Sequence, residues 1–202
     1  MYQTPRHLAD IETRNRSLAP FFGLGFQKGI LEEKIFQKIV DHFAQNKAQY
    51  YPEGDIPHLQ TSKPNYSPSL LVHDPEFNRN LGRELKALHE EWSGMELKEA
   101  ACYGIRVYQP GSYLYNHVDR TATHIISSTI CVAHYLHKPW PLYIEDIDGN
   151  PHEISMEPGE MVFYEGAKLM HGRPYPLDGR FYAGLFLHYT PVNWKFSARD
   201  LS

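Results

Sequence analysis

Two side chains that can bind a metal ion lie two residues apart, at His117 and Asp119. In a β-strand or at its end, residues i and i+2 point to the same side, so an imidazole nitrogen and a carboxylate oxygen can converge on one ion. His171, which follows after several predicted strands, offers a third ligand. Two histidines and one carboxylate form a facial triad, an arrangement that suits Fe(II) because it leaves coordination positions open on one side.

The His-x-Asp pair is a weak signal by itself. With 12 histidines in 202 residues, such a pair is expected by chance roughly half the time. Arg180 strengthens the hypothesis because it begins an otherwise apolar strand nine residues after His171. A lone arginine that enters a buried strand needs an anionic partner. A dicarboxylate co-substrate could supply one through a bidentate pair, and its charges together with that of Asp119 would balance Fe(II) and Arg180.

Short strands dominate the chain after residue 98. Turn residues such as Gln109-Pro110-Gly111-Ser112 and Asp148-Gly149-Asn150 separate them. The predicted strands are 100–108, 113–117, 123–136, 141–146, 151–155, 160–165 and 180–190. Many short antiparallel strands at this spacing favour a sandwich or a jelly roll.

The first half of the chain has the periodicity of helices. Apolar residues recur at helical spacing in 31–46 and 75–93, and the Asp74-Pro75 step suits a helix start. Residues 50–70, between them, are rich in proline, tyrosine and polar side chains and are predicted to form a long loop. We therefore expect one domain over 1–202, with helical support and a loop in 1–98 and a β-rich catalytic core in 99–197.

Composition excludes several classes of protein. The net charge of −4 gives no electrostatic footprint for nucleic acid or an anionic membrane. The sequence contains no apolar run long enough to span a bilayer, and its polar N-terminus lacks the apolar stretch of a signal peptide. Only Cys102 and Cys131 are present, so the sequence predicts reduced thiols packed in strands and a cytoplasmic protein.

The residues around the expected metal site resemble the prolyl 4-hydroxylase branch of the 2-oxoglutarate oxygenases. His117, Asp119, His171 and Arg180 are similar to the family's iron and 2-oxoglutarate signature. The segment Arg106-Val107-Tyr108-Gln109-Pro110-Gly111 looks like the strand and turn that precede the first ligand in the family. The resemblance covers roughly residues 100–195 and implies an α+β fold, a double-stranded β-helix (jelly roll) buttressed by N-terminal helices.

The resemblance also implies cofactors and a reaction. Fe(II) would be held by His117, Asp119 and His171, with 2-oxoglutarate bound by Arg180, Tyr108 and Tyr135. The implied reaction consumes O2, converts 2-oxoglutarate to succinate and carbon dioxide, and hydroxylates a C–H bond. Ascorbate, which keeps the iron ferrous, is implied as well. The metal supplies the hard chemistry and the protein orients the groups, so no side chain need act as an acid or base.

Three further residues are candidates for contact with a substrate: His188, Arg106 and Arg173. His188 shares one strand face with Arg180, towards the mouth of the barrel, if the alternation along 180–190 is regular. The Phe-x-His at 186–188 is similar to the Trp-x-His that lines the peptide site of collagen-type enzymes, with phenylalanine in place of tryptophan. Arg106 shares a face with Tyr108, and Arg173 lies two residues after the last predicted ligand.

The preferred substrate is a prolyl residue of a peptide or protein, and this choice depends on the resemblance. The first alternative keeps the cofactors and changes the substrate to a free amino acid or another small metabolite. The second alternative is a non-catalytic β-barrel module that retains a metal site. Nucleic-acid demethylation by the same cofactor fits poorly, because the chain is acidic.

Overall fold

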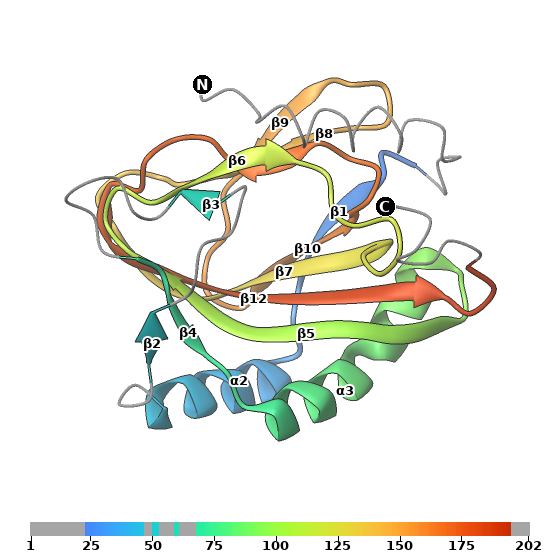
Figure 1. The fold of residues 1–202 in the computed structure, drawn as a ribbon, viewed down its shortest axis with the longest axis horizontal. Coiled ribbons are helices and arrows are strands. Elements are labelled where there is room, and N and C mark those ends of the chain that lie inside the picture. Colours follow the sequence, from blue (N-terminus) through green and yellow to red (C-terminus); the bar gives the residue numbers. More distant parts are fainter. Residues whose placement is uncertain (1–22, 47–49, 53–58, 61–67, 195–202) are drawn as a thin grey trace.

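The structure, a computed structural model, describes residues 23–46, 50–52, 59–60 and 68–194. Two antiparallel β-sheets face each other, and two helices cover the outer side of the larger sheet (Figure 1). The larger sheet has seven strands in the order β1-β10-β7-β12-β5-β4-β2, and the smaller has five in the order β3-β6-β11-β8-β9. Consecutive strands alternate between the sheets through most of the second half of the chain, which is the topology of a jelly roll.

The strands of the larger sheet carry most of the apolar core. Their bounds are β1 Phe26–Ile30, β2 Tyr51–Pro52, β4 Leu70–Val72, β5 Leu97–Tyr108, β7 Ile126–Leu136, β10 Glu160–Glu165 and β12 Gly179–Pro191. β12 lies at the centre, between β7 and β5. Its pairing with β7 shifts register between Gly179 and Phe181 and again between Ala183 and Gly184. Side chains nevertheless alternate between the two faces of the strand, with Leu185 and Leu187 on the side of the helices and Tyr182 and Phe186 on the side of the smaller sheet.

The smaller sheet carries two of the three expected metal ligands. Its strands are β3 Leu59–Gln60, β6 Tyr113–His117, β8 Leu142–Glu145, β9 Pro151–Ile154 and β11 His171–Arg173. β8 and β9 form a hairpin whose turn is held by Asp146. The Asp146 carboxylate accepts hydrogen bonds from the backbone N–H groups of Asp148 and Asn150, each at 2.9 Å. His152 lies 2.9 Å from the same carboxylate, and this contact, with the backbone donors, lowers the pKa of Asp146.

The two helices are α2, Glu33–Gln45, and α3, Pro75–Ser93. α3 begins where the sequence predicts, because the Asp74 side chain accepts hydrogen bonds from the backbone N–H groups of Glu76 and Phe77. It ends at Gly94, whose φ of 65° is left-handed. Buried side chains of both helices pack on the larger sheet in one apolar cluster that includes Ile39, Leu81, Leu85, Ile130, Leu185 and Leu187.

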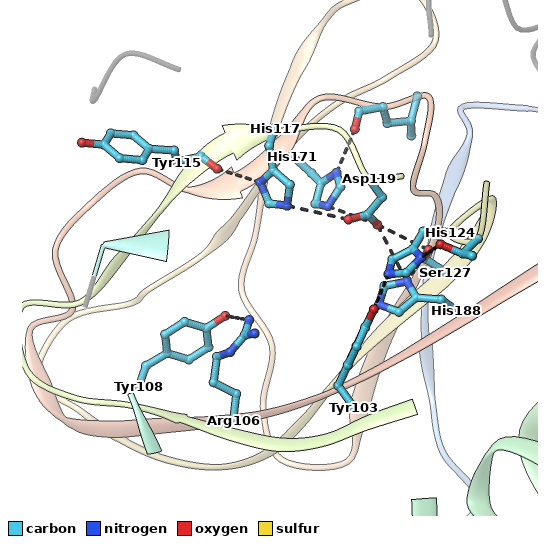
Figure 2. Close-up of polar contacts among 12 residues, drawn as sticks. Tyr103, Arg106, Tyr108, Tyr115, His117, Asp119, His124, Ser127, His171 and His188 are labelled. Atoms are coloured by element: carbon cyan, nitrogen blue, oxygen red, sulfur yellow. Dashed lines mark hydrogen bonds and ion pairs between the residues drawn. The ribbon is translucent and has the colours of Figure 1, made fainter. Parts of the chain in front are cut away.

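A second cluster lines the space between the two sheets. It contains several aromatic side chains, among them Tyr108, Tyr164 and Tyr182, together with Leu142 and Ile144. Each of these side chains is less than a tenth exposed. The space between the sheets is therefore lined by hydroxyl-bearing rings as well as by aliphatic groups, and the expected metal ligands adjoin it (Figure 2).

The predicted jelly roll with helical support is confirmed, as are both helices and the positions of the seven predicted strands. Five strands were not predicted: β1, β2, β3, β4 and β11. β2, β3, β4 and β11 have two or three residues each, too few to show an alternating pattern. β1, FQKGI, is an edge strand with a glycine and a lysine, so its composition resembles that of a loop.

The expected long loop at 50–70 is corrected in part, because β2, β3 and the start of β4 lie within it. Within that segment, Tyr50 stacks on Phe43 of α2, with ring centroids 5.9 Å apart. Cys102 and Cys131 are free thiols within β5 and β7. Within the described residues, neither helix is long and apolar enough to cross a membrane.

Candidate metal centre

The three expected ligands lie together at one end of the smaller sheet (Figure 2). His117 is the last residue of β6, His171 is the first residue of β11, and the two are register partners in the antiparallel pair. Asp119 lies two residues beyond the end of β6. Its backbone N–H donates to the carbonyl of Gly166 at 2.8 Å, which fixes the chain at that point. A strand pairing and one backbone hydrogen bond therefore place all three ligands.

Hydrogen bonds to backbone carbonyls set the orientation of both imidazoles. Nδ1 of His117 lies 2.8 Å from the carbonyl oxygen of Tyr115, and Nδ1 of His171 lies 2.8 Å from that of Leu169. A carbonyl can only accept, so each Nδ1 carries the proton. In the neutral ring the lone pair is then on Nε2, and the two Nε2 atoms are the nitrogens that face Asp119. This is the arrangement by which proteins orient metal-binding histidines.

The separations among the ligand atoms leave room for an ion. Nε2 of His117 is 3.8 Å from Oδ1 of Asp119, and Nε2 of His171 is 3.8 Å from Oδ2. These distances are too long for hydrogen bonds. All three ligand atoms lie within 4.8 Å of one another, with both histidines buried. A hard carboxylate oxygen with two imidazole nitrogens is a donor set for iron and similar divalent ions, so these residues fit the group that the resemblance implies.

A second layer of polar side chains supports Asp119 from the larger sheet. The hydroxyl of Ser127, on β7, lies 3.5 Å from Oδ2 of Asp119 and 2.9 Å from Nδ1 of His188, on β12. The ring of His188 stacks on His124 with centroids 3.8 Å apart, and the Tyr103 hydroxyl lies 3.1 Å from Nε2 of His124. Burial lowers the pKa of both His188 and His124, so both rings stay neutral near pH 7.

Gly166 allows this close approach of backbone and ligand. A Cβ at this position would lie 2.4 Å from Oδ2 of Asp119 and 2.5 Å from the Ser127 hydroxyl oxygen. Only glycine leaves space for the carboxylate beside the carbonyl that holds its own backbone. The sequence contains no signal for this role, because Gly166 is one of 14 glycines and lies far from Asp119 in the chain.

His188 faces the space between the sheets, which is the face expected from the alternation along 180–190. The side chain is buried and lies beside the metal centre, with Nδ1 3.8 Å from Oδ2 of Asp119. Side chains alternate regularly along β12 despite its register shifts: Tyr182 and Phe186 pack with the inter-sheet cluster, and Ala183, Leu185 and Leu187 pack with the cluster beneath the helices. Ser127 was not among the sequence candidates, since a serine within an apolar strand has no distinctive pattern.

The expected burial of Arg180 is wrong. Arg180 is exposed, at the start of β12. Its guanidinium lies over the ring of Tyr135, 4.6 Å from the centroid, and Tyr135 is itself 47% exposed. The first register shift on β12 lies at this residue, between Gly179 and Phe181. An exposed guanidinium is solvated by water, so Arg180 does not need an anionic partner inside the protein.

Two other arginines lie closer to the space between the sheets. Arg106 is half-buried on β5, with its guanidinium 5.3 Å from the centroid of Phe186 and one nitrogen 3.4 Å from the Tyr108 hydroxyl (Figure 2). Arg173 is 3% exposed and ends β11. It donates a hydrogen bond to the carbonyl of Trp140 and another, at 2.9 Å, to the Tyr182 hydroxyl. The structure therefore brings Tyr108, Arg106 and Arg173 to the interior and leaves Arg180 and Tyr135 outside it.

The chain matches no family model and no curated protein sequence. Solved structures do match its fold. A prolyl 4-hydroxylase from Pseudomonas putida superposes with a TM-score of 0.61 at 15% identity, covering 91% of this chain and 98% of the other. A prolyl hydroxylase from Trichoplax adhaerens, in complex with a hypoxia-inducible-factor peptide, has a TM-score of 0.62 at 11% identity and covers 99% and 97%.

HygX from Streptomyces hygroscopicus, bound to nickel, 2-oxoglutarate and hygromycin B, is similar to the same degree. Its TM-score is 0.62 at 12% identity, with coverage of 96% of this chain and 89% of that one. The chain therefore has the fold of the 2-oxoglutarate- and iron-dependent oxygenases over nearly its whole length. The matched proteins include both peptide-bound and small-molecule-bound structures, so the fold alone does not choose between these classes of substrate.

Proposed function

We propose that this single-domain protein is an Fe(II)- and 2-oxoglutarate-dependent dioxygenase with His117, Asp119 and His171 as its iron ligands. The observation that carries the proposal is the convergence of two carbonyl-oriented Nε2 atoms and one carboxylate at the end of a jelly-roll sheet. When bound, iron, 2-oxoglutarate and O2 supply an oxidant that hydroxylates a C–H bond, with release of succinate and carbon dioxide.

The protein's own part is to orient and to exclude water. The carbonyls of Tyr115 and Leu169 keep both imidazoles in the tautomer that binds a metal. The Ser127 hydroxyl and the backbone of Gly166 hold Asp119 from the opposite side. The buried rings of the inter-sheet cluster shield the interior, where an ordered co-substrate would meet few water molecules.

Among substrates, we favour a prolyl residue of a peptide or protein. The order of ligands along the chain and the Phe186-x-His188 segment support this choice, as does the fold shared with two prolyl hydroxylases. Phe186 is half-buried beneath Arg106, so an aromatic wall adjoins a cation on the side of β12 that faces the interior. A small metabolite is the alternative, supported by the equal likeness to HygX.

The direct test is turnover by the purified chain, reconstituted with Fe(II) and supplied with 2-oxoglutarate and ascorbate. Succinate release is measured against a panel of proline-containing peptides, and against free amino acids and other small metabolites. We expect release to be stimulated by peptides and mass spectrometry to find one added oxygen on proline. His117→Ala and Asp119→Ala should abolish turnover, because each removes a ligand and leaves too few donors to hold the ion.

A matched control is His137→Ala, which removes an exposed histidine that pairs with Asp178 at the surface, 3.2 Å away, and contacts the exposed ring of Tyr135. This variant should keep full turnover. Stimulation by small molecules alone would replace the prolyl substrate and keep the chemistry. Retention of iron with no succinate under any condition would instead identify a non-catalytic metal-binding module.

A further inference from the structure

We propose that Arg173, and not Arg180, binds the carboxylate of 2-oxoglutarate that lies distal to the metal. This inference rests on the proposed function and names the cation of its co-substrate site. Arg173 is a positive side chain inside the space between the sheets, two residues from the ligand His171. Four observations support it: its burial, its partners, its position relative to the ligand, and the exposure of Arg180.

The burial of Arg173 calls for an anion. The residue is 3% exposed, and its guanidinium has only neutral hydrogen-bond acceptors among its identified partners, the Trp140 carbonyl and the Tyr182 hydroxyl. Within the described part of the chain, no Asp or Glu forms an ion pair with it. A buried charge without a counter-ion is costly. A guanidinium has five N–H donors in a planar fork, so donors remain for a carboxylate.

The neighbours of Arg173 already hold it in one orientation. Its guanidinium lies 4.2 Å from the ring centroid of Tyr182 and 4.7 Å from that of Trp140. Contacts of a cation with aromatic faces and two hydrogen bonds restrict the rotamers of a long side chain before any ligand arrives. Tyr108 completes this aromatic wall, with its ring centroid 4.9 Å from that of Trp140. Folding therefore orders the arginine side chain before the ligand binds, so binding itself loses less conformational entropy and is tighter.

Arg173 and the ligand His171 lie two residues apart on β11, so their Cα atoms are separated by roughly 6–7 Å. The end carbons of extended 2-oxoglutarate are roughly 5 Å apart, given ordinary bond lengths, which is a length of the same order. The ring of Tyr164 lies 4.6 Å from that of His171. Tyr164 and Tyr182 belong to the same buried cluster, and the Tyr182 hydroxyl accepts a hydrogen bond from Arg173. The metal ligands and Arg173 therefore border the same interior space.

Arg106 is the remaining interior arginine, and it is less suited to this role. It is half-buried rather than buried. Its guanidinium lies 5.3 Å from the ring centroid of Phe186, on the side of β12 where we propose that the substrate binds. A half-exposed cation keeps part of its hydration, so it has less need of a permanent anionic partner. Arg106 thus remains a candidate for contact with the substrate. The experiment below includes Arg106→Gln to test whether this arginine binds the distal carboxylate instead.

The experiment measures binding without turnover. Isothermal titration calorimetry of the Zn(II)-loaded full chain uses two ligands of equal length: 2-oxoglutarate, and 2-oxopentanoate, which lacks the distal carboxylate. The variants are Arg173→Gln, Arg173→Lys, Arg180→Gln and Arg106→Gln. Loss of a buried charged partner should weaken 2-oxoglutarate binding to Arg173→Gln by on the order of 100-fold. Binding of 2-oxopentanoate should change by less than about threefold, because it never contacts the guanidinium.

Arg173→Lys should regain part of the affinity, because a lysine keeps the charge and loses the bidentate geometry. Arg180→Gln should bind both ligands as the wild type does. If Arg173→Gln folds poorly, Tyr182→Phe removes the hydroxyl that accepts from the guanidinium and keeps the ring. It should reduce the preference for 2-oxoglutarate over 2-oxopentanoate in the same direction, by less.

The inference is overturned if Arg173→Gln keeps its preference for 2-oxoglutarate, or if the preference is lost only in Arg180→Gln or Arg106→Gln. An equal loss for both ligands in Arg173→Gln would also overturn it, because that result indicates a structural role. Failure of the proposed function is a different result. In that case the wild type, with its metal bound, binds neither ligand, or binds both with no preference.

Discussion

At the scale of single residues, two adjacent serines of β7 have different roles: one supports the metal centre and the other supports the apolar core. Ser127 faces the space between the sheets and contacts Asp119 and His188. Ser128 faces the helices, and its hydroxyl lies 2.8 Å from Nε2 of His89. Both serines are fully buried. Their opposite directions follow from the alternation of side chains along a strand.

We expect Ser127→Ala to weaken metal binding by about tenfold, the lower end of the effect of removing a group that orients a metal ligand. Asp119 would keep its backbone hydrogen bond to Gly166 and lose the hydroxyl that holds its carboxylate. Metal affinity is measured anaerobically for Fe(II), by competition with a coloured chelator.

Ser128→Ala is the matched control. It should leave metal affinity unchanged and lower the free energy of unfolding by about 1–3 kcal/mol, because it leaves a buried imidazole nitrogen without its donor. Chemical denaturation of the metal-free protein measures this. Equal metal affinities of the two variants would show that the contact between Ser127 and Asp119 has no role in holding the ion.

The sequence predicts residues of the site well where they recur in a short motif, and poorly where contact depends on tertiary structure. The His117-x-Asp119 pair and the downstream His171 could be identified because strand geometry and ligand chemistry act over a few residues. The spacing from His171 favours Arg180, but the start of β12 leaves its side chain exposed. Nothing in the sequence indicates that Trp140 and Tyr182 enclose Arg173, so its burial could not be predicted.

At the scale of elements, α3 is attached to the larger sheet by a buried histidine. Nδ1 of His89 lies 2.8 Å from the carbonyl of Leu85, and Nε2 lies 2.8 Å from the Ser128 hydroxyl. The ring also packs against Tyr189 and Phe163. The carbonyl can only accept a hydrogen bond and Nε2 accepts from the serine, so the ring is neutral with its proton on Nδ1.

Burial lowers the pKa of His89 from 6.5 to about 4. In the unfolded chain the imidazole regains its ordinary value, so between these two values the unfolded state binds more protons than the folded state. Stability from this residue is therefore fully present above pH 6.5 and is lost as the pH falls towards about 4. A difference of this size corresponds to roughly 3 kcal/mol.

His89→Gln is the variant that tests this. Glutamine has a donor and an acceptor but cannot become protonated. We therefore expect the free energy of unfolding of the variant to fall less steeply than that of the wild type between pH 7 and pH 5, a range that begins above 6.5 and ends between the two pKa values of His89. Urea denaturation at both pH values gives the comparison, and other buried histidines contribute equally to both proteins. Parallel pH profiles for the two proteins would contradict the assignment.

Elements with a long, regular pattern could be predicted from the sequence. α3 has a capping aspartate, a proline at its first turn and a left-handed glycine after its end, and its predicted bounds agree with the structure. The short strand β11 could not be predicted, because three residues show no periodicity and the strand is formed by pairing with β6 and β8. This undetected strand carries both His171 and Arg173, so the sequence could not reveal that they share an element.

At the scale of the whole molecule, the metal centre joins the two sheets. His117 and His171 belong to the smaller sheet. Asp119 is held by Ser127, which belongs to the larger sheet, and by Gly166, which directly follows β10 of that sheet. An ion bound by all three ligands therefore crosslinks the two layers at one end of the jelly roll. The same contacts cannot form in the unfolded chain, where the ligands are far apart.

Binding to the folded state alone must stabilise the fold. At a free metal concentration of a hundred times Kd, the free energy of unfolding rises by about 2.7 kcal/mol. For a protein of this size that corresponds to a rise in Tm of roughly 5–10 °C. Thermal unfolding of the chelator-treated protein, with and without Zn(II), measures the shift, and 2-oxoglutarate added with the metal should raise Tm further.

His171→Ala should show no shift in Tm at the same metal concentration, since the remaining two ligands belong to one short segment. A shift of equal size in that variant would mean that the ion binds elsewhere and that the two sheets are held together by their packing alone.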